Sequence, residues 1–243
     1  MPNIMKYTID TYTKHLLLIL VFSLAFVIAF IIPVFASFPT FNDAGGIFVR
    51  LTSVLTNLTP FTTAVIIFST LFSLLFLSFA IVAINLIVKH SRTSTRIRKE
   101  VMDGLEKYTA KVFGVLLLYT IIVFAVSMFN FLLGISSLYS YLIGLVITPF
   151  FFYAPAAIVI DEQKTGRSLT ASLRFFFKRL DYFVLWLVLA IVLLTLFDFI
   201  FIAATGTLYS RYITLIFDAL FILPFLVVLQ SQCYMRRFAL LKR

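Results

Sequence analysis

Long apolar stretches alternate with short polar segments along the whole chain, and each apolar stretch holds about twenty residues or more with few charges. At ~1.5 Å per residue, about twenty helical residues cover the ~30 Å hydrocarbon core of a membrane. The pattern therefore predicts an all-α fold, a polytopic transmembrane helical bundle that forms a single integral membrane domain over residues 1–243. Its six predicted spans lie at about residues 16–36, 61–88, 112–133, 138–160, 182–204 and 208–235.

The amino-acid composition supports a membrane protein and excludes an ordinary soluble domain. Apolar residues make up 62% of the chain and charged residues 12%, whereas soluble domains carry about 25% charged residues. The single cysteine, Cys233, excludes an internal disulfide and a thiolate metal site.

The first apolar stretch allows two interpretations. It ends in Val34-Phe35-Ala36, which matches a signal-peptidase site, so cleavage would leave five spans. Its length exceeds the 7 to 15 apolar residues of a usual signal peptide. We therefore favour an uncleaved first span.

Two of the polar connecting segments show the periodicity of amphipathic helices. Apolar residues recur at steps of three and four, which places them on one helix face. In the first segment these are Ile97, Val101, Leu105, Tyr108 and Val112; in the second they are Leu169, Leu173, Phe176 and Leu180. The N-terminal segment, residues 1–14, could lie in the interface as a third short helix. The chain thus divides into three helical hairpins, each preceded by such a segment: residues 3–88, 97–160 and 165–235. Whether they descend from an ancient triplication stays open.

Basic residues orient the bundle. Of the twenty lysines and arginines, all but Arg50 and Arg211 fall in the N-terminal segment, residues 89–111, residues 161–181 or the C-terminal tail. Positively charged segments stay on the cytoplasmic side of membrane proteins. We therefore predict a multi-pass protein of the cell (cytoplasmic) membrane with both termini in the cytoplasm.

A short run of residues resembles a known family. Residues Pro155-Ala156-Ala157-Ile158-Val159-Ile160-Asp161-Glu162, then Gly166, then Ser168-Leu169-Thr170-Ala171-Ser172-Leu173-Arg174 are similar to the membrane domain of glycerophosphoryl diester phosphodiesterases and to related uncharacterised six-helix proteins of bacteria and archaea. The resemblance covers about forty residues closely. The sequence contains no phosphodiesterase catalytic domain, so the resemblance implies only a membrane bundle that anchors, partners or conducts.

Motifs for catalysis and cofactor binding are missing. His15 and His90 belong to no metal-binding pattern, and the chain has no phosphate-binding glycine loop and no nucleophile elbow. We predict that the protein is not an enzyme and binds no cofactor.

Two aspartates in the predicted spans suggest one possible function. Asp198 and Asp218 fall at comparable depth in adjacent antiparallel spans, and Asn130 and Arg211 lie at a similar level. Ionisable residues inside a membrane usually face a bundle interior, a water-filled cavity or each other. These residues could form a polar path for a proton or cation in a transporter or channel component. Alternatively they serve as structural contacts between helices, and the sequence favours this second interpretation.

Basic residues on the cytoplasmic segments suggest a second function. Such residues orient the chain among anionic lipid headgroups and could also dock a cytoplasmic protein partner. The candidate docking residues are Arg174, Lys178, Arg179, Arg96, Arg98 and Lys99. A nucleic-acid partner is not expected, because the membrane already accounts for these charges. The sequence therefore favours a non-enzymatic membrane anchor or scaffold, with the transporter or channel component as the alternative.

Overall fold

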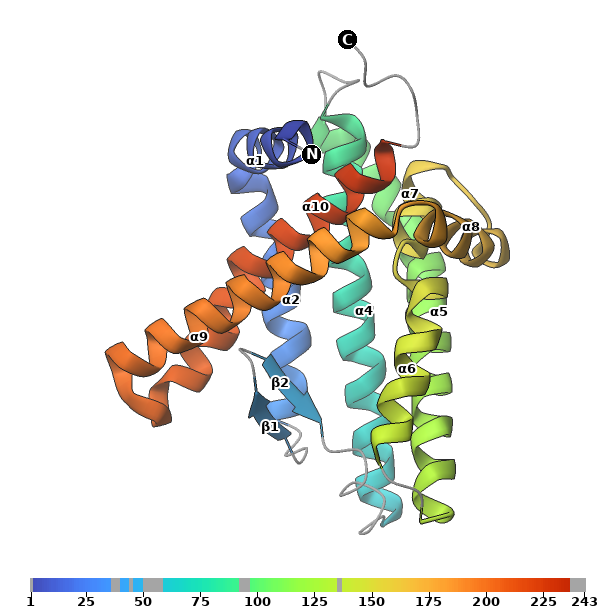
Figure 1. Cartoon of the computed structure of the whole chain (residues 1–243), viewed down its shortest axis with the longest axis vertical. Coiled ribbons are helices and arrows are strands. Elements are labelled where there is room, and N and C mark those ends of the chain that lie inside the picture. Colours follow the sequence, from blue (N-terminus) through green and yellow to red (C-terminus); the bar gives the residue numbers. More distant parts are fainter. Residues whose placement is uncertain are drawn as a thin grey trace.

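The structure, a computed structural model, is a helical bundle with one short β-hairpin, and it describes residues 2–35, 40–43, 46–49, 59–91, 97–134 and 137–236 (Figure 1). The predicted all-α class is therefore confirmed, with the hairpin as an addition. The elements are α1 (Pro2–Lys14), α2 (Leu16–Phe35), β1 (Thr40–Asp43), β2 (Gly46–Val49), α4 (Pro60–His90), α5 (Ile97–Leu132), α6 (Ser137–Phe151), α7 (Ala154–Ile160), α8 (Thr165–Lys178), α9 (Leu180–Phe217), the π-helical turn η1 (Asp218–Ile222) and α10 (Leu223–Met235).

Six helical stretches of the described residues are long and apolar enough to cross a membrane. They are Leu16–Pro33, Pro60–His90, Lys99–Leu132, Leu142–Ile160, Leu180–Gly206 and Tyr212–Met235. These stretches follow the six predicted spans in number and order, so the protein is a multi-pass membrane protein. The third begins well before the predicted residue 112, because the amphipathic segment and the span form one continuous helix.

Helix α5 is the longest single straight element and joins two parts that the sequence predicted separately. Its 36 residues extend for about 54 Å. The predicted apolar face is confirmed at Val101, Leu105, Tyr108 and Val112, which are all at most 5% exposed; the side chain of Ile97 lies outside the described residues. This face packs against α4.

Close packing of α4 and α5 depends on a glycine. A methyl group added at Gly104 would lie 2.7 Å from both terminal carbons of Leu86. Leu86 is 1% exposed and sits in the main core, so it has little space into which to move. The glycine therefore sets how closely the two helices approach.

The last three spans depart from regular helices at prolines and at one glycine. The fourth span breaks between α6 and α7, with Pro149 before the break and Pro155 after it. Residue Gly206, with φ of 74°, reverses the chain inside α9, within the predicted turn at residues 205–207. The π-helical turn η1 ends two residues before Pro224, whose missing N–H interrupts the helical hydrogen-bond pattern.

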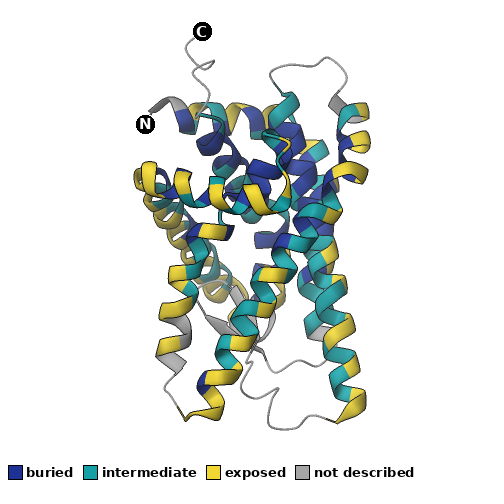
Figure 2. Cartoon of the chain, turned by 90° about the vertical axis from the view of Figure 1, so that its right-hand side faces the viewer, coloured by how far each residue is buried: buried dark blue, intermediate teal, exposed yellow. Residues whose placement is uncertain are grey.

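The buried core occupies one end of the bundle, which we call the termini end because α1 and the end of α10 lie there (Figures 1 and 2). Side chains from Ile84 to Val88, Ala154 to Val159 and Leu226 to Leu229 form its centre. Towards the other end the helices expose large apolar side chains, such as Phe68, Phe129 and Phe199. Such surfaces are compatible with lipid, which does not penalise exposed apolar groups.

Candidate functional site

The polar groups of the termini end centre on the break in the fourth span. In a continuous helix the N–H of Tyr153 would bond to the carbonyl of Pro149. Here the hydroxyl of Ser172, from α8, lies between them: it accepts from the Tyr153 N–H at 2.9 Å and donates to the Pro149 carbonyl at 2.8 Å. One buried side chain thus satisfies both backbone groups that the break separates, and it attaches α8 to the span.

Side chains of α10 and α9 complete the hydrogen bonding around this break. Gln230 of α10 donates to the carbonyl of Phe152 at 2.6 Å. The indole N–H of Trp186 donates to the carbonyl of Leu226 at 2.8 Å, and its ring packs edge-on against Phe152 at 4.8 Å. Polar backbone groups cannot be left unpaired inside a membrane. These hydrogen bonds therefore stabilise the break in the fourth span.

The amphipathic prediction for α8 is partly wrong. Phe176 is buried as predicted, but Leu169 and Leu173 are only half-buried and Leu180 is 49% exposed. The buried face instead runs through Ser168, Ser172, Phe175 and Phe176. Ser172 is stable on this face because its hydroxyl bonds both backbone groups at the break in the fourth span.

The acidic turn after α7 is held by two separate sets of partners. Asp161 accepts hydrogen bonds from the Tyr234 hydroxyl at 2.7 Å and the Gln163 amide at 3.2 Å. Glu162 forms ion pairs with Lys89 at 2.9 Å and Lys107 at 2.8 Å. The hydrogen bonds from these two lysines lower the pKa of Glu162 to about 2. The turn is thereby tied to both α4 and α5.

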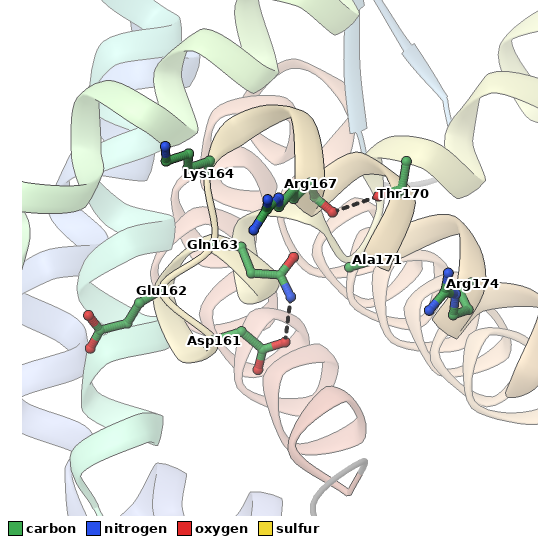
Figure 3. A pocket seen from close by; sticks show the side chains of 8 residues that line it. All are labelled: Asp161, Glu162, Gln163, Lys164, Arg167, Thr170, Ala171 and Arg174. Carbon is green, nitrogen blue, oxygen red and sulfur yellow. Dashed lines mark hydrogen bonds between the residues drawn. The ribbon is translucent and has the colours of Figure 1, made fainter.

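A hollow of about 460 Å³ opens between this turn and the outward face of α8 (Figure 3). We call it the basic hollow; it is lined by Asp161, Glu162, Gln163, Lys164, Arg167, Thr170, Ala171 and Arg174. In Figure 3 the carboxylate of Glu162 points away from Arg167 and Arg174. The three cations Lys164, Arg167 and Arg174 are exposed, and among the described residues they take part in no ion pair. The hollow is therefore positively charged.

The predicted docking residues fall into different environments. Arg174 and Lys178 are exposed on α8, and Lys99 is exposed on α5. Arg179 is partly buried, donates to the Tyr182 hydroxyl at 2.8 Å and covers its ring at 4.6 Å. Arg179 therefore contacts Tyr182 within the protein and is less accessible to a partner than Arg174 and Lys178 are. Arg96 lies outside the described residues, as does the side chain of Arg98.

The structure brings Asp198 and Asp218 into one neighbourhood. Thr214 donates to a carboxylate oxygen of Asp198 at 3.4 Å, and Asp218 lies one helical turn after Thr214. Asp218 is 4% exposed and opens the π-helical turn η1. Neither of its carboxylate oxygens has a hydrogen-bond partner in the described part of the chain.

The other two residues of the predicted polar path, Asn130 and Arg211, are not shown to lie near the two aspartates. Asn130 is buried on α5, and the elements that pack most closely against α5 are α4, α6, α7 and α8, not α9 or η1. The structure therefore does not bring Asn130 to Asp198 or Asp218. The side chain of Arg211 lies outside the described residues.

Several important residues escaped the sequence analysis. Gln230 is a polar residue in an apolar span, as Asp198 and Asp218 are. The polar run Gln230-Ser231-Gln232 in the sixth predicted span could therefore have indicated contacts between helices. Ser231 donates to Asn85 at 2.8 Å, and Gln232 donates to Thr11 at 3.0 Å. Ser172 gave no such signal, because its partners are backbone groups that only the break exposes.

Comparison of the chain with known protein families, curated proteins and solved structures finds no match. Within the described residues, no three His, Cys, Asp or Glu side chains gather closely enough to hold a metal ion. The fold and the site thus define the class, a multi-pass helical membrane protein with a basic hollow at its termini end.

Proposed function

We propose that the chain is a non-enzymatic scaffold of the cytoplasmic membrane that binds anionic lipid headgroups in the basic hollow. The observation that carries this proposal is the set of exposed cations Lys164, Arg167 and Arg174 around one hollow, without ion-pair partners in the described residues. In the proposed orientation the termini end faces the cytoplasm. The hollow then lies at the level of the headgroups.

The charge balance of the hollow favours an anionic ligand. The negative charge of Glu162 is matched by Lys89 and Lys107 on its far side. Asp161 alone opposes the three cations, so a net positive charge remains. Guanidinium groups bind phosphate oxygens through paired hydrogen bonds, and two of the three cations, Arg167 and Arg174, carry such groups.

The proposal is tested by native mass spectrometry of the protein purified in mild detergent. We expect phosphatidylglycerol to remain bound and phosphatidylcholine to be lost. Replacing both Arg167 and Arg174 by Gln should weaken binding by about 3 kcal/mol, roughly 150-fold, since each hydrogen bond to a charged group contributes about 1.5 kcal/mol or more.

A control variant removes the same charge elsewhere on the termini end. Lys6 and Lys14 are exposed on α1 and lie outside the hollow. Replacing both by Gln should leave phosphatidylglycerol binding within about twofold of wild type. Equal losses in the two variants would refute a defined site and indicate unspecific charge attraction. Co-purification of a soluble acidic protein that only the Arg167 and Arg174 variant loses would replace the lipid by a protein partner.

The alternative function, a transporter or channel component, draws support from one observation. Asp198 and Asp218 lie on neighbouring helical segments inside the predicted membrane region, and Asp218 is buried. Replacing both by Asn in reconstituted vesicles should abolish proton or cation flux if they carry it. Unchanged flux in that variant would refute a path through these residues.

A further inference from the structure

A stripe of buried polar residues leads from the hairpin turn at Gly206 into the last span. Ser210, Thr214 and Asp218 follow one another at intervals of four, which places them on one helix face. They are 3%, 2% and 4% exposed. About 12 Å of helix separates Ser210 from Asp218. The stripe thus reaches deep into the bundle from the end opposite the termini.

The stripe ends at Asp218. Further along α10 the same side of the helix continues with Ile222 and Leu226, which are 6% and 1% exposed and belong to an apolar cluster. The next buried polar pair, Asn85 and Ser231, lies 13 residues beyond Asp218, about 20 Å along the helix. Between them, the Tyr12 hydroxyl of α1 donates to the Phe221 carbonyl of η1 at 3.1 Å, so one polar side chain approaches this turn from the termini end as well.

The carboxylate of Asp218 has an environment that calls for a positive charge. It is 4% exposed, and neither oxygen receives a hydrogen bond in the described part of the chain. Burying an ionised group inside a membrane without a partner is costly. Among the described residues, the charged group that acts on it is a second carboxylate, that of Asp198, which accepts a hydrogen bond from Thr214. Two neighbouring negative charges raise the cost further.

The surrounding elements offer few cations to compensate. The turn η1 packs against α2, α9 and α10, and the titratable Tyr12 of α1 donates its hydroxyl to the Phe221 carbonyl of this turn at 3.1 Å. Helix α2 contains no titratable residue, and the titratable residues of α10, Cys233 and Tyr234, lie at its far end. In the sequence Arg211 is the nearest basic residue on the same segment, and its side chain lies outside the described residues.

We propose that Asp218, Asp198 and Thr214 form a site for one monovalent cation, an alkali ion or a proton. The three side chains supply up to five oxygen atoms around the turn η1. The π-helical turn widens the helix at this point, and such turns often occur at functional sites. A divalent ion fits less well, since it demands six or more oxygen ligands or several water molecules.

The proposal is tested by thermal unfolding of the protein in lipid nanodiscs. Sodium chloride is titrated against N-methylglucamine chloride at constant ionic strength and fixed pH, and pH is varied separately without sodium. A cation that binds only the folded state raises the unfolding temperature. A response to sodium at fixed pH identifies an alkali ion. A response to pH alone, together with an infrared band of a protonated carboxylic acid that Asp218→Asn removes, identifies a proton.

Variants decide whether the response belongs to this site. Asp218→Asn should abolish it, whereas Asp103→Asn, at an exposed carboxylate on α5, should retain it. If Asp218→Asn fails to fold, Thr214→Val keeps both carboxylates and should weaken the response at least several-fold. The proposal is overturned if wild type responds to neither cation, or if the Asp218 and Thr214 variants respond as wild type does. It is also overturned if Arg211→Gln alone creates a response that wild type lacks, because Arg211 would then be the native counter-ion.

Discussion

Replacing Ser172 by Ala should destabilise the protein more than any other removal of a single hydroxyl from α8. The Ser172 hydroxyl is fully buried and bonds both the Tyr153 N–H and the Pro149 carbonyl across the break in the fourth span. Its loss leaves one donor and one acceptor unpaired. At about 1 to 3 kcal/mol for each unsatisfied buried group, the free energy of unfolding should fall by roughly 2 to 6 kcal/mol.

The matched control for this prediction is Ser168→Ala. Ser168 is also fully buried on α8, but its hydroxyl donates only to the carbonyl of Thr165, one turn earlier in the same helix. Within the described residues it bonds no backbone group outside α8, so the expected loss is at most about 1 kcal/mol. Ser172→Thr retains the hydroxyl and should recover part of the stability.

The assay is equilibrium unfolding in mixed detergent micelles with increasing sodium dodecyl sulfate, followed by tryptophan fluorescence and circular dichroism. Trp186, the single tryptophan, packs on Phe152 beside the break and reports on this region. If Ser172→Ala and Ser168→Ala lose equal stability, the hydroxyl does not hold the break open. The Tyr153 N–H and the Pro149 carbonyl would then bond directly in a straightened helix.

Three further predictions follow from the contacts between the turn, α4 and α5. Gly104→Ala should cost about 1 to 3 kcal/mol through overpacking against Leu86, and combining it with Leu86→Val should recover more than half of that loss in the same unfolding assay; additive losses would contradict the predicted clash. Glu162 has a pKa lowered from its ordinary value of 4.5 to about 2 by Lys107 and Lys89; its stabilising effect is therefore present above about pH 4.5 and lost as the pH falls to 2. Unfolding temperatures measured across this range should fall less steeply in Glu162→Gln than in wild type, and parallel curves would exclude the ion pairs as the cause. Glu162 also has φ of 55°, so Glu162→Gly should be about 1 kcal/mol more stable than Glu162→Gln, because only glycine adopts this conformation without a penalty; the reverse order would show that the backbone is unstrained there.

The number and order of the spans could be predicted from the sequence for a simple physical reason. A lipid environment demands about twenty apolar residues per crossing, and this demand acts on each stretch separately. The same holds for the face of α5 through Val101, Leu105 and Tyr108, which follows from helical periodicity alone. Local rules of this kind need no knowledge of the neighbouring segments.

The arrangement of the candidate sites was decided by tertiary structure. Ser172 and Gln230 bond backbone groups that become available only because the fourth span breaks beside them. The basic hollow exists because Glu162 turns towards Lys89 and Lys107, which leaves the cations of α8 without an internal partner. The positions of Asp198 and Asp218 in the sequence predicted that they lie at similar depth. The hydrogen bond from Thr214 to Asp198 and the π-helical turn at Asp218 became evident only from the tertiary structure. Periodicity and composition determine which residues enter the membrane, whereas pairings between segments far apart in the chain depend on where helices bend and meet.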